Sequence, residues 1–356
     1  MTTTETGLVG SPLPLDALAS VPKSDAPQKP KDYTSDQEVR WCPGCGDYVI
    51  LATIRALLPK LGLKRENITF ISGIGCSSRF PYYLETYGMH SIHGRAPAIA
   101  TGLATARPDQ SVWVVTGDGD AMSIGGNHLI HTLRRNVNLN ILMFNNRIYG
   151  LTKGQYSPTS EAGKVTKSSP MGSLDHPFNP LSLVLGAQAS FVARALDSDR
   201  KGLTEVLDAA ARHRGTSFVE ILQDCPIFND GSFDLLRKED AGNHLIGVRH
   251  GEKIIFGDEG QHCVVRSGFS LKVAATAEVD EADIIVHDAH AEDPSYAHAL
   301  ANLSSQDLEY TVTGIIRQVQ RETYDDQARA QVAAAKETAP SDLQALLDGS
   351  NTWTVG

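Results

Sequence analysis

Short apolar runs alternate with helix-length segments along the chain, and this alternation restricts the fold more than any other feature. Residues 111–116, Ser-Val-Trp-Val-Val-Thr, form a continuous run that is typical of a parallel strand buried on both faces. Further runs of this kind occur at residues 68–71, 139–144, 190–196 and 217–223. Helical periodicity lies between them, at about residues 47–58, 94–106, 125–136 and 200–213. We therefore predict an α/β fold with a doubly wound, mostly parallel sheet.

The regularity of this pattern divides the chain into three parts. Residues 1–38 are rich in Thr, Ser, Pro and Lys and have little periodicity, so we expect an irregular N-terminal tail. Residues 39–230 hold the alternation and form the expected main domain. In residues 231–356 it weakens, and we expect a C-terminal extension. Residues 146–180 contain no clear element, and a loop of that length inside a domain is usually an active-site lid or a disordered segment.

Composition excludes several classes of protein. The formal charge of −10, from 32 basic and 42 acidic residues, disfavours nucleic acid and anionic membranes as partners. No apolar run approaches the roughly 18 residues of a membrane span, and the N-terminus lacks the pattern of a signal peptide. We therefore expect a cytoplasmic protein without a membrane or nucleic-acid partner. In that compartment five cysteines favour metal binding or redox chemistry over disulfides.

The most informative motif is Gly-Asp-Gly-Asp at residues 117–120, followed at residues 145–146 by Asn-Asn. Asp118 comes just after one predicted strand and Asn146 just after the next. A right-handed crossover makes those strands parallel, so both side chains emerge at the edge where open α/β sheets bind ligands. Each motif alone is commonly a strand-end turn. Together, at this spacing, they indicate a binding site.

The residues of this motif suit Mg²⁺, which prefers hard oxygen ligands and takes part of its coordination from phosphate groups. Asp118 offers a carboxylate, Asn146 an amide oxygen and Ile148 a backbone carbonyl. Gly117 and Gly119 permit close approach of the backbone. The pattern resembles the thiamine-diphosphate signature, GDG followed by NN.

Four cysteines fall near the same edge of the predicted sheet. Cys42 and Cys45 form a Cys-x-x-Cys pair, Cys76 lies on a glycine turn after a predicted strand, and Cys225 follows another strand. Four thiolates suit a 4Fe–4S cluster or a structural zinc ion, although zinc ribbons usually have a second pair. A thioredoxin-like pair is a further reading, but it should follow a strand. Cys263, in an apolar run, is expected to be a core thiol.

The combination resembles the β subunit of the 2-oxoacid:ferredoxin oxidoreductases, in particular the 2-oxoglutarate type. The resemblance spans residues 41–225, somewhat over half the chain. The motifs that carry it are WCPGCG at 41–46, GIGCSSR at 73–79, HGRA at 93–96, GDGD at 117–120, NN at 145–146 with Ile148 and GLT at 150–152, and Cys225.

The resemblance implies three groups of site residues. Contacts with thiamine diphosphate would come from Ile74, Gly75, Cys76, Ser77, His93, Gly117, Gly119, Asp120, Gly150 and Leu151. Mg²⁺ would bind Asp118, Asn146 and Ile148. The 4Fe–4S cluster would be held by Cys42, Cys45, Cys76 and Cys225. His93 would hydrogen-bond the diphosphate or the substrate, although a lone histidine is more often structural.

The reaction implied by the resemblance is oxidative decarboxylation of a 2-oxoacid with coenzyme A, giving acyl-CoA, CO₂ and reduced ferredoxin. An α subunit would complete the active site. Arg79 would select 2-oxoglutarate, and thus succinyl-CoA as product, because a guanidinium pairs with a distal carboxylate. Alternatively, Arg79 is solvated in a surface loop, and Lys153, Lys164 or Lys167 selects the substrate in its place.

Other functions remain open at this point. Pyruvate or a branched-chain 2-oxoacid is the alternative substrate. A non-oxidative thiamine-dependent lyase or synthase is another enzyme class, but such chains are normally longer and need no placed cysteines. A non-enzymatic electron-transfer or zinc-stabilised scaffold leaves the GDGD and NN motifs unexplained.

Overall fold

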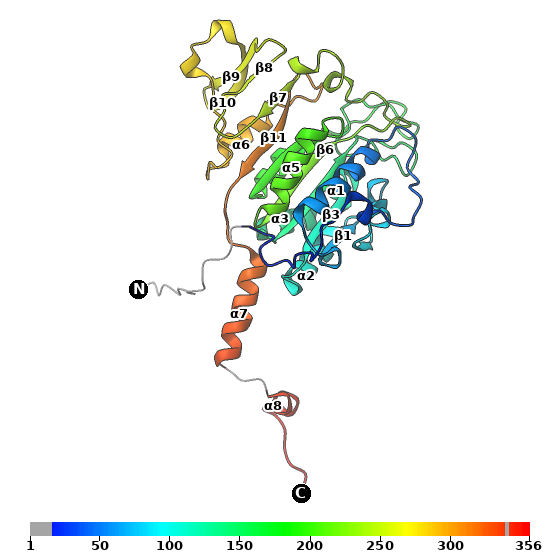
Figure 1. The fold of residues 1–356 in the computed structure, drawn as a ribbon, viewed down its shortest axis with the longest axis vertical. Coiled ribbons are helices and arrows are strands. Elements are labelled where there is room, and N and C mark those ends of the chain that lie inside the picture. The colour runs from blue at the N-terminus through cyan, green and yellow to red at the C-terminus, as the bar shows by residue number, and fades with distance from the viewer. Residues whose placement is uncertain (1–15, 339–341) are drawn as a thin grey trace.

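The computed structural model describes residues 16–338 and 342–356, and its centre is an eight-stranded sheet (Figure 1). The strand order is β2-β1-β3-β4-β6-β5-β11-β7. The strands are β1 (Ile68–Ser72), β2 (Tyr87–His90), β3 (Ser111–Gly117), β4 (Leu139–Asn145), β5 (Phe191–Leu196), β6 (Thr216–Leu222), β7 (Leu245–Val248) and β11 (Thr311–Gln318). The first six strands of that order are mutually parallel, whereas β11 is antiparallel to β5 and parallel to β7.

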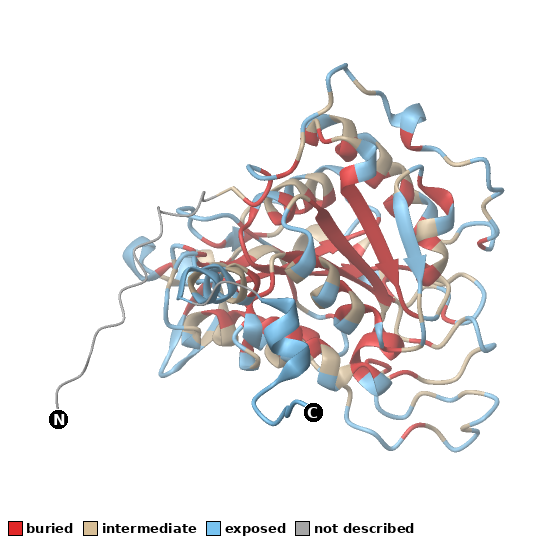
Figure 2. Cartoon of the chain, turned by 90° about the horizontal axis from the view of Figure 1, so that it is seen from below, coloured by how far each residue is buried: buried red, intermediate tan, exposed pale blue. Residues whose placement is uncertain are grey.

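Helices cover both faces of the sheet, which confirms the doubly wound α/β fold. The helices on one face are α1 (Asp47–Leu61) and α5 (Arg200–Arg212). Those on the other face are α2 (Ala96–Ala106), α3 (Gly126–Arg135), α4 (Pro180–Gly186) and α6 (Ser295–Ala301). Within β3, Trp113 and Val115 pack in the hydrophobic core under α1 and α5. Val112 and Val114 pack in the core on the opposite face of the sheet. Burial on both sides explains the continuous apolar run and the buried central strands in Figure 2.

The segment 231–356, expected as an extension, contributes two strands to the main sheet. Gly314 shows why β11 carries little apolar pattern: its φ is +104°, and a Cβ there would lie 2.4 Å from the carbonyl oxygen of Val248. The segment also forms a small antiparallel sheet of β8 (Ile255–Phe256), β9 (His262–Ser267) and β10 (Ser270–Ala275). Cys263 is buried within it, as expected of a core thiol.

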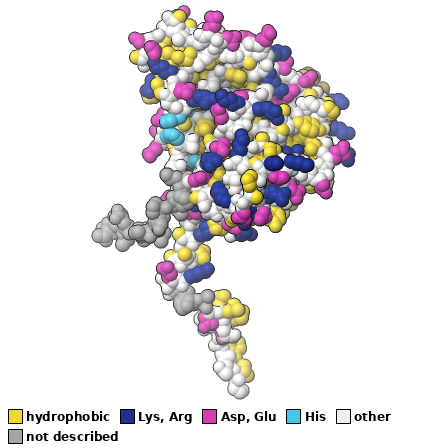
Figure 3. Space-filling model, in the orientation of Figure 1, with side chains coloured by type: hydrophobic (Ala, Val, Ile, Leu, Met, Phe, Trp, Pro, Cys, Tyr) yellow, Lys and Arg dark blue, Asp and Glu magenta, His cyan; other side chains and the backbone are white. Residues whose placement is uncertain are grey.

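The C-terminal helices α7 (Tyr324–Thr338) and α8 (Leu343–Asp348) project from the body of the protein (Figure 1). The tip of this segment carries exposed apolar side chains, among them Leu346 and Trp353 (Figure 3). On the body, basic and acidic side chains are intermixed over the face shown in Figure 3.

The remaining expected features are irregular segments. Of the N-terminal tail, residues 1–15 lie outside the described part, and residues 16–38 contain only a short 3₁₀ turn. No helix or strand interrupts residues 146–179, which form the expected long loop. Short 3₁₀ turns occur at Pro30–Tyr33, Arg65–Asn67, Ser77–Tyr83, Asp234–Leu236, Ala241–Asn243, Thr276–Glu278 and Glu281–Asp283. Within the described ranges, no helix combines the length and apolarity needed to cross a lipid bilayer.

Candidate active site

The carboxyl ends of four parallel strands meet at one edge of the sheet. Ser72 of β1 pairs with Val115, and Asn145 of β4 pairs with Leu222 of β6. The turns that follow β1, β3 and β4 therefore border a common cleft. Its lining comprises Ile74, Gly75, Cys76, Ser77, His93, Gly117, Asp118, Gly119, Asp120, Phe144, Asn146, Ile148, Tyr149, Gly150, Leu151 and Thr152. The structure thus brings together every residue that the sequence assigned to thiamine diphosphate or Mg²⁺.

Asp118 is held by two hydroxyl groups from the long loop. Its carboxylate is 3% exposed, and its Oδ2 accepts hydrogen bonds from Ser157 Oγ at 2.5 Å and Thr159 Oγ1 at 2.6 Å. Burial raises the pKa of Asp118 to about 6, although both hydroxyls favour the ionised form. A divalent cation beside this carboxylate would offset the cost of its burial, which fits the expected metal site.

Asn146 and Ile148 supply neutral oxygens next to this carboxylate. The side-chain Nδ2 of Asn146 donates to Gln223 Oε1 at 3.1 Å, so its Oδ1 faces the other way and accepts from the Ile148 backbone N–H at 3.2 Å. Among the described residues, no three or more His, Cys, Asp or Glu are grouped so that they could hold a metal ion. One carboxylate with amide and carbonyl oxygens is nevertheless a donor set that Mg²⁺ accepts when a diphosphate supplies further oxygens.

Asp120 connects the walls of the cleft. Its Oδ1 accepts hydrogen bonds from the backbone N–H groups of Ile74 at 3.1 Å and Gly94 at 2.7 Å, and it contacts His93 Nδ1. Its Oδ2 accepts from Thr116 Oγ1 at 2.7 Å. The carboxylate of Asp120 is therefore occupied in holding the turn after β1 and the loop at residues 93–94. His93 retains Nε2 for a ligand.

Cys76 and Cys225, two of the four cysteines of the predicted cluster, lie close together beside this cleft. A Cβ placed on Gly150 would lie 3.6 Å from both Cys76 Sγ and Cys225 Sγ, so the two sulfurs border the same small volume. Cys45 N–H donates to the carbonyl oxygen of Cys42 at 3.1 Å, which folds that pair into a turn.

Burial controls the protonation of Cys45, Cys76 and Cys225. It raises the pKa of Cys76 to about 12 and raises the pKa values of Cys45 and Cys225, and the neighbouring thiols raise them further. Buried thiols of this kind are protonated unless a cation stabilises their thiolates. Thiols that need a cation and lie beside the cleft fit the expected metal cluster.

Arg79 lies in the 3₁₀ turn Ser77–Tyr83, directly after the cysteine turn. It is half-buried, its charge acts to lower the pKa of Cys76, and it is not among the residues that line the cleft. In the part of the chain that the structure describes, no carboxylate forms an ion pair with it. Lys153, Lys164 and Lys167 line a separate hollow beside the aromatic ring of Phe228.

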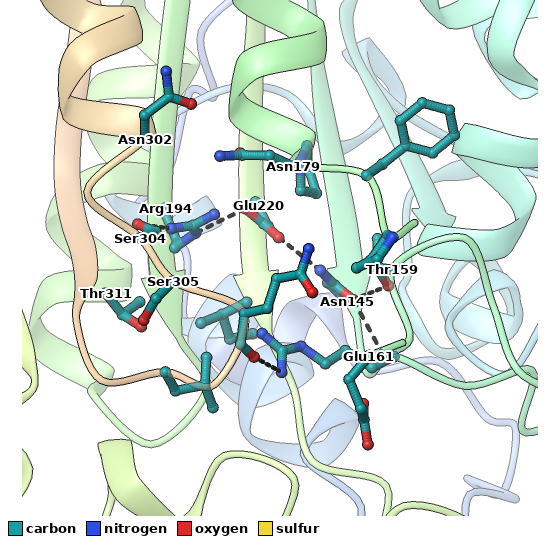
Figure 4. A pocket seen from close by; sticks show the side chains of 17 residues that line it. Asn145, Thr159, Glu161, Asn179, Arg194, Glu220, Asn302, Ser304, Ser305 and Thr311 are labelled. Carbon is teal, nitrogen blue, oxygen red and sulfur yellow. Dashed lines mark hydrogen bonds and ion pairs between the residues drawn. The ribbon is translucent and has the colours of Figure 1, made fainter. Parts of the chain in front are cut away.

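A polar cavity of about 170 Å³ lies on the other side of Asn145 (Figure 4). Asn145 Nδ2 donates to Glu220 Oε1 at 2.7 Å, and Arg194 Nε donates to Glu220 Oε2 at 2.8 Å. Thr159 Oγ1 lies 2.8 Å from Asn145 Oδ1, and Arg194 also bonds to the loop before β11. Buried hydrogen bonds therefore connect Thr159, whose hydroxyl bonds to Asp118, with the C-terminal segment.

Three polar residues that hold the site in place were not predicted from the sequence. Ser157 and Thr159 lie in a loop without periodicity, and only their position after the Asn-Asn motif could have drawn attention to them. Gln223 lies two residues before Cys225 at a strand end, which is a weak signal on its own.

Fold and site together define a class of protein, the thiamine-diphosphate enzymes. Residues 73–221 match the model of the thiamine pyrophosphate enzyme C-terminal TPP-binding domain. This range contains the whole lining of the cleft, including Cys76.

Comparison with individual proteins is more specific. The chain is 73% identical, over 99% of its length and 94% of the relative's, to the 2-oxoglutarate oxidoreductase subunit KorB of Mycobacterium tuberculosis. It is 44% identical, over 52% of its length and 69% of the relative's, to the 2-oxoglutarate synthase subunit KorB of Archaeoglobus fulgidus. It also matches a solved structure, 2-oxoglutarate:ferredoxin oxidoreductase from Magnetococcus marinus with 2-oxoglutarate, coenzyme A and succinyl-CoA bound. That match has a TM-score of 0.71 and 34% identity, covering 90% of this chain and 95% of the other. The chain belongs to the β subunits of the 2-oxoacid:ferredoxin oxidoreductases, of the 2-oxoglutarate type.

Proposed function

We propose that this oxidoreductase subunit binds thiamine diphosphate with Mg²⁺, carries a 4Fe–4S cluster, and acts with an α subunit. The complex converts 2-oxoglutarate and coenzyme A to succinyl-CoA and CO₂. The two electrons released pass through the cluster to ferredoxin. The observation that carries the proposal is the position of Cys76 and Cys225 beside the thiamine-diphosphate cleft, because that arrangement combines carbon chemistry with one-electron transfer.

The metal and diphosphate half of the proposal rests on the oxygens that follow β3 and β4. Asp118, Asn146 and the carbonyl of Ile148 would hold Mg²⁺, and the glycines at 117 and 119 leave room for the diphosphate. Gly119 is required for packing as well, because a Cβ there would lie 2.1 Å from the ring of Tyr149. Bound thiamine diphosphate supplies the nucleophilic carbon and the electron sink for decarboxylation. His93 would hydrogen-bond the diphosphate or substrate through Nε2, while Asp120 keeps its ring in place.

The cluster half rests on Cys42, Cys45, Cys76 and Cys225. A single zinc ion draws its sulfur ligands to about 2.3 Å from one point. The described residues contain no group tight enough to hold a single ion, while Gly150 leaves space between Cys76 and Cys225. A 4Fe–4S cluster has separate irons that hold its thiolates apart, so it needs no such tight group. Gly150 also lines the cleft, so the cluster would lie next to the bound thiamine.

The substrate assignment is supported by the relatives named above and by Arg79. The Arg79 guanidinium lies beside Cys76 and pairs with no carboxylate of the described residues. It suits the distal carboxylate of 2-oxoglutarate, whereas pyruvate offers only a methyl group there. Because Arg79 does not line the cleft of this chain alone, its side chain would have to turn toward the substrate when the site is complete.

The need for an α subunit is supported by the rim of the cleft. Ile74, Ile92, Ile124 and Leu151 are exposed by 36%, 73%, 59% and 45%. Ile74 and Leu151 line the cleft itself. Apolar side chains gathered at the mouth of a polar site are typical of a surface that another protein covers.

The test is an assay of the complex purified without oxygen. It should reduce a viologen dye when 2-oxoglutarate and coenzyme A are both present, and much less with pyruvate. The same preparation should show a broad visible absorption that dithionite bleaches, with about four irons per β subunit as expected for the cluster type. Absence of iron would refute the cluster, and absence of 2-oxoglutarate-dependent reduction would refute the activity.

A further inference from the structure

Gln223 lies between the candidate metal site and the candidate cluster and contacts a residue of each. It follows β6 directly and is 1% exposed. Its Nε2 donates to Cys45 Sγ at 3.3 Å, and its Oε1 accepts from Asn146 Nδ2 at 3.1 Å. One buried amide therefore joins a predicted cluster ligand to a predicted Mg²⁺ ligand.

The orientation of this amide is dictated by its surroundings. Gln223 Nε2 also donates to the backbone carbonyl oxygen of Asp224, which can only accept a hydrogen bond. In a flipped amide, Oε1 of Gln223 would face the carbonyl oxygen of Asp224, and both atoms are acceptors. With Nε2 fixed there, Oε1 must face Asn146, and Asn146 must in turn present Nδ2 to it. The amide oxygen of Asn146 is thereby directed away from Gln223.

The position of the side chain is fixed as tightly as its orientation. Gly46, directly after Cys45, packs against it, and a Cβ at Gly46 would lie 2.9 Å from Gln223 Cγ. The backbone N–H of Gln223 donates to the carbonyl oxygen of Asn145 at 3.0 Å. No other side chain of the described residues donates a hydrogen bond to Cys45, so this contact is specific to Gln223.

We propose that Gln223 is a positioning residue that tunes both cofactor sites at once. Its N–H group stabilises negative charge on Cys45 and so raises the reduction potential of the cluster, because hydrogen bonds to ligand sulfurs favour the reduced state. Its carbonyl group keeps the amide oxygen of Asn146 available to Mg²⁺. The inference rests on the proposed cluster and metal site. Gln223 acts through Cys45 and Asn146 and needs no contact with the substrate.

Two substitutions separate the two contacts. Gln223→Met removes both, so the cluster should have a more negative midpoint potential, and half-maximal thiamine-diphosphate binding should need more Mg²⁺. Gln223→Glu replaces the donor facing Cys45 but keeps an oxygen that can accept from Asn146. Its potential should fall, while its Mg²⁺ requirement should stay nearer to that of the wild type.

The control is Gln110→Met. Gln110 is a buried glutamine with two hydrogen bonds, to Thr69 and Glu66, and it precedes β3 at the amino end of the sheet, opposite the site. This variant should keep the wild-type potential and Mg²⁺ requirement, even if its stability falls.

The measurements are a redox titration of the cluster followed by electron paramagnetic resonance and a Mg²⁺ titration of cofactor binding, both on the complete complex. A wild-type potential in Gln223→Met would overturn the inference and leave the proposed function intact. If Gln223→Met loses its iron while Gln110→Met keeps it, the midpoint potential of Gln223→Glu tests the inference instead. A lowered potential supports the inference, and a wild-type potential overturns it. Wild-type complex without iron would overturn the proposed cluster and this inference together.

Discussion

Thr159 Oγ1 lies 2.6 Å from Oδ2 of Asp118, although the two residues belong to segments 41 positions apart. The contact joins the long loop after β4 to the carboxylate that is expected to bind Mg²⁺. Because Ser157 makes a second such contact, the loop holds one oxygen of the carboxylate in place before any ligand binds.

Thr159→Val should weaken Mg²⁺-dependent binding of thiamine diphosphate. The substitution keeps the shape of the side chain but removes a hydrogen bond to a charged group, worth about 1.5–3 kcal/mol, or roughly 10- to 100-fold in affinity. Cofactor binding followed by fluorescence would measure the change. Thr166→Val, in the same loop without contact to Asp118, is the control. Equal affinities in the Thr159 variant and the wild type would contradict a role for the loop.

Asp118→Ala should abolish Mg²⁺ and thiamine-diphosphate binding and leave the visible spectrum of the cluster unchanged. The metal would lose its charged protein ligand, whereas no cysteine contact is altered. Cofactor content of the purified variant is the measurement, with Asp175→Ala, an exposed carboxylate of the loop, as control. Normal cofactor content would show that Asp118 does not hold the metal.

Cys42→Ser, Cys45→Ser, Cys76→Ser and Cys225→Ser should each lower the iron content of the protein. Cys263→Ser should not, because that thiol is buried in the small sheet with Val265 and Ile284. Iron assays and visible spectra of the five variants test the ligand set. Retention of full iron by the Cys225 variant, or loss of it from the Cys263 variant, would require a different set.

Arg79→Leu should raise the KM for 2-oxoglutarate steeply and affect pyruvate little. A charge pair in a desolvated site gives discrimination on the order of 10²–10⁴, more than a difference of one methylene. Steady-state kinetics of the complex with both substrates are the measurement. Lys153→Met provides the comparison, and a loss of 2-oxoglutarate preference in that variant alone would make Lys153 the selector.

His213 should make the protein less stable as the pH falls. Burial lowers the pKa of His213 to about 4, while its unfolded value is near 6.5, so the unfolded chain takes up the proton first. The contribution of neutral His213 is complete above pH 6.5 and is lost progressively between pH 6.5 and about 4. The loss is at most about 3 kcal/mol.

Chemical denaturation of the wild type and His213→Gln between pH 4 and 7.5 tests this contribution. The variant should show a shallower fall in the free energy of unfolding, because glutamine does not titrate. Parallel curves for the two proteins would exclude His213 as a source of acid sensitivity.

The sequence by itself determined the class of fold and the edge at which the site lies. Runs such as residues 111–116 can be buried on both faces only in a sheet covered by helices on both sides. Once these strands are parallel, Asp118 and Asn146 must emerge at the same edge. These inferences needed only local periodicity and chain direction, so no detailed packing was required.

Only the tertiary structure decided which distant side chains meet at that edge. Asp120 lines the cleft as expected, and the structure adds that its carboxylate ties together Ile74, Gly94 and Thr116. Gln223 and Thr159 have only weak local signals, since their partners belong to other segments of the chain. The strand β11 was not predicted from the sequence either, because Gly314 interrupts its apolar pattern where the backbone of β7 passes close by. Periodicity records whether a residue is buried, but hydrogen-bond partners depend on how loops and strands pack in three dimensions.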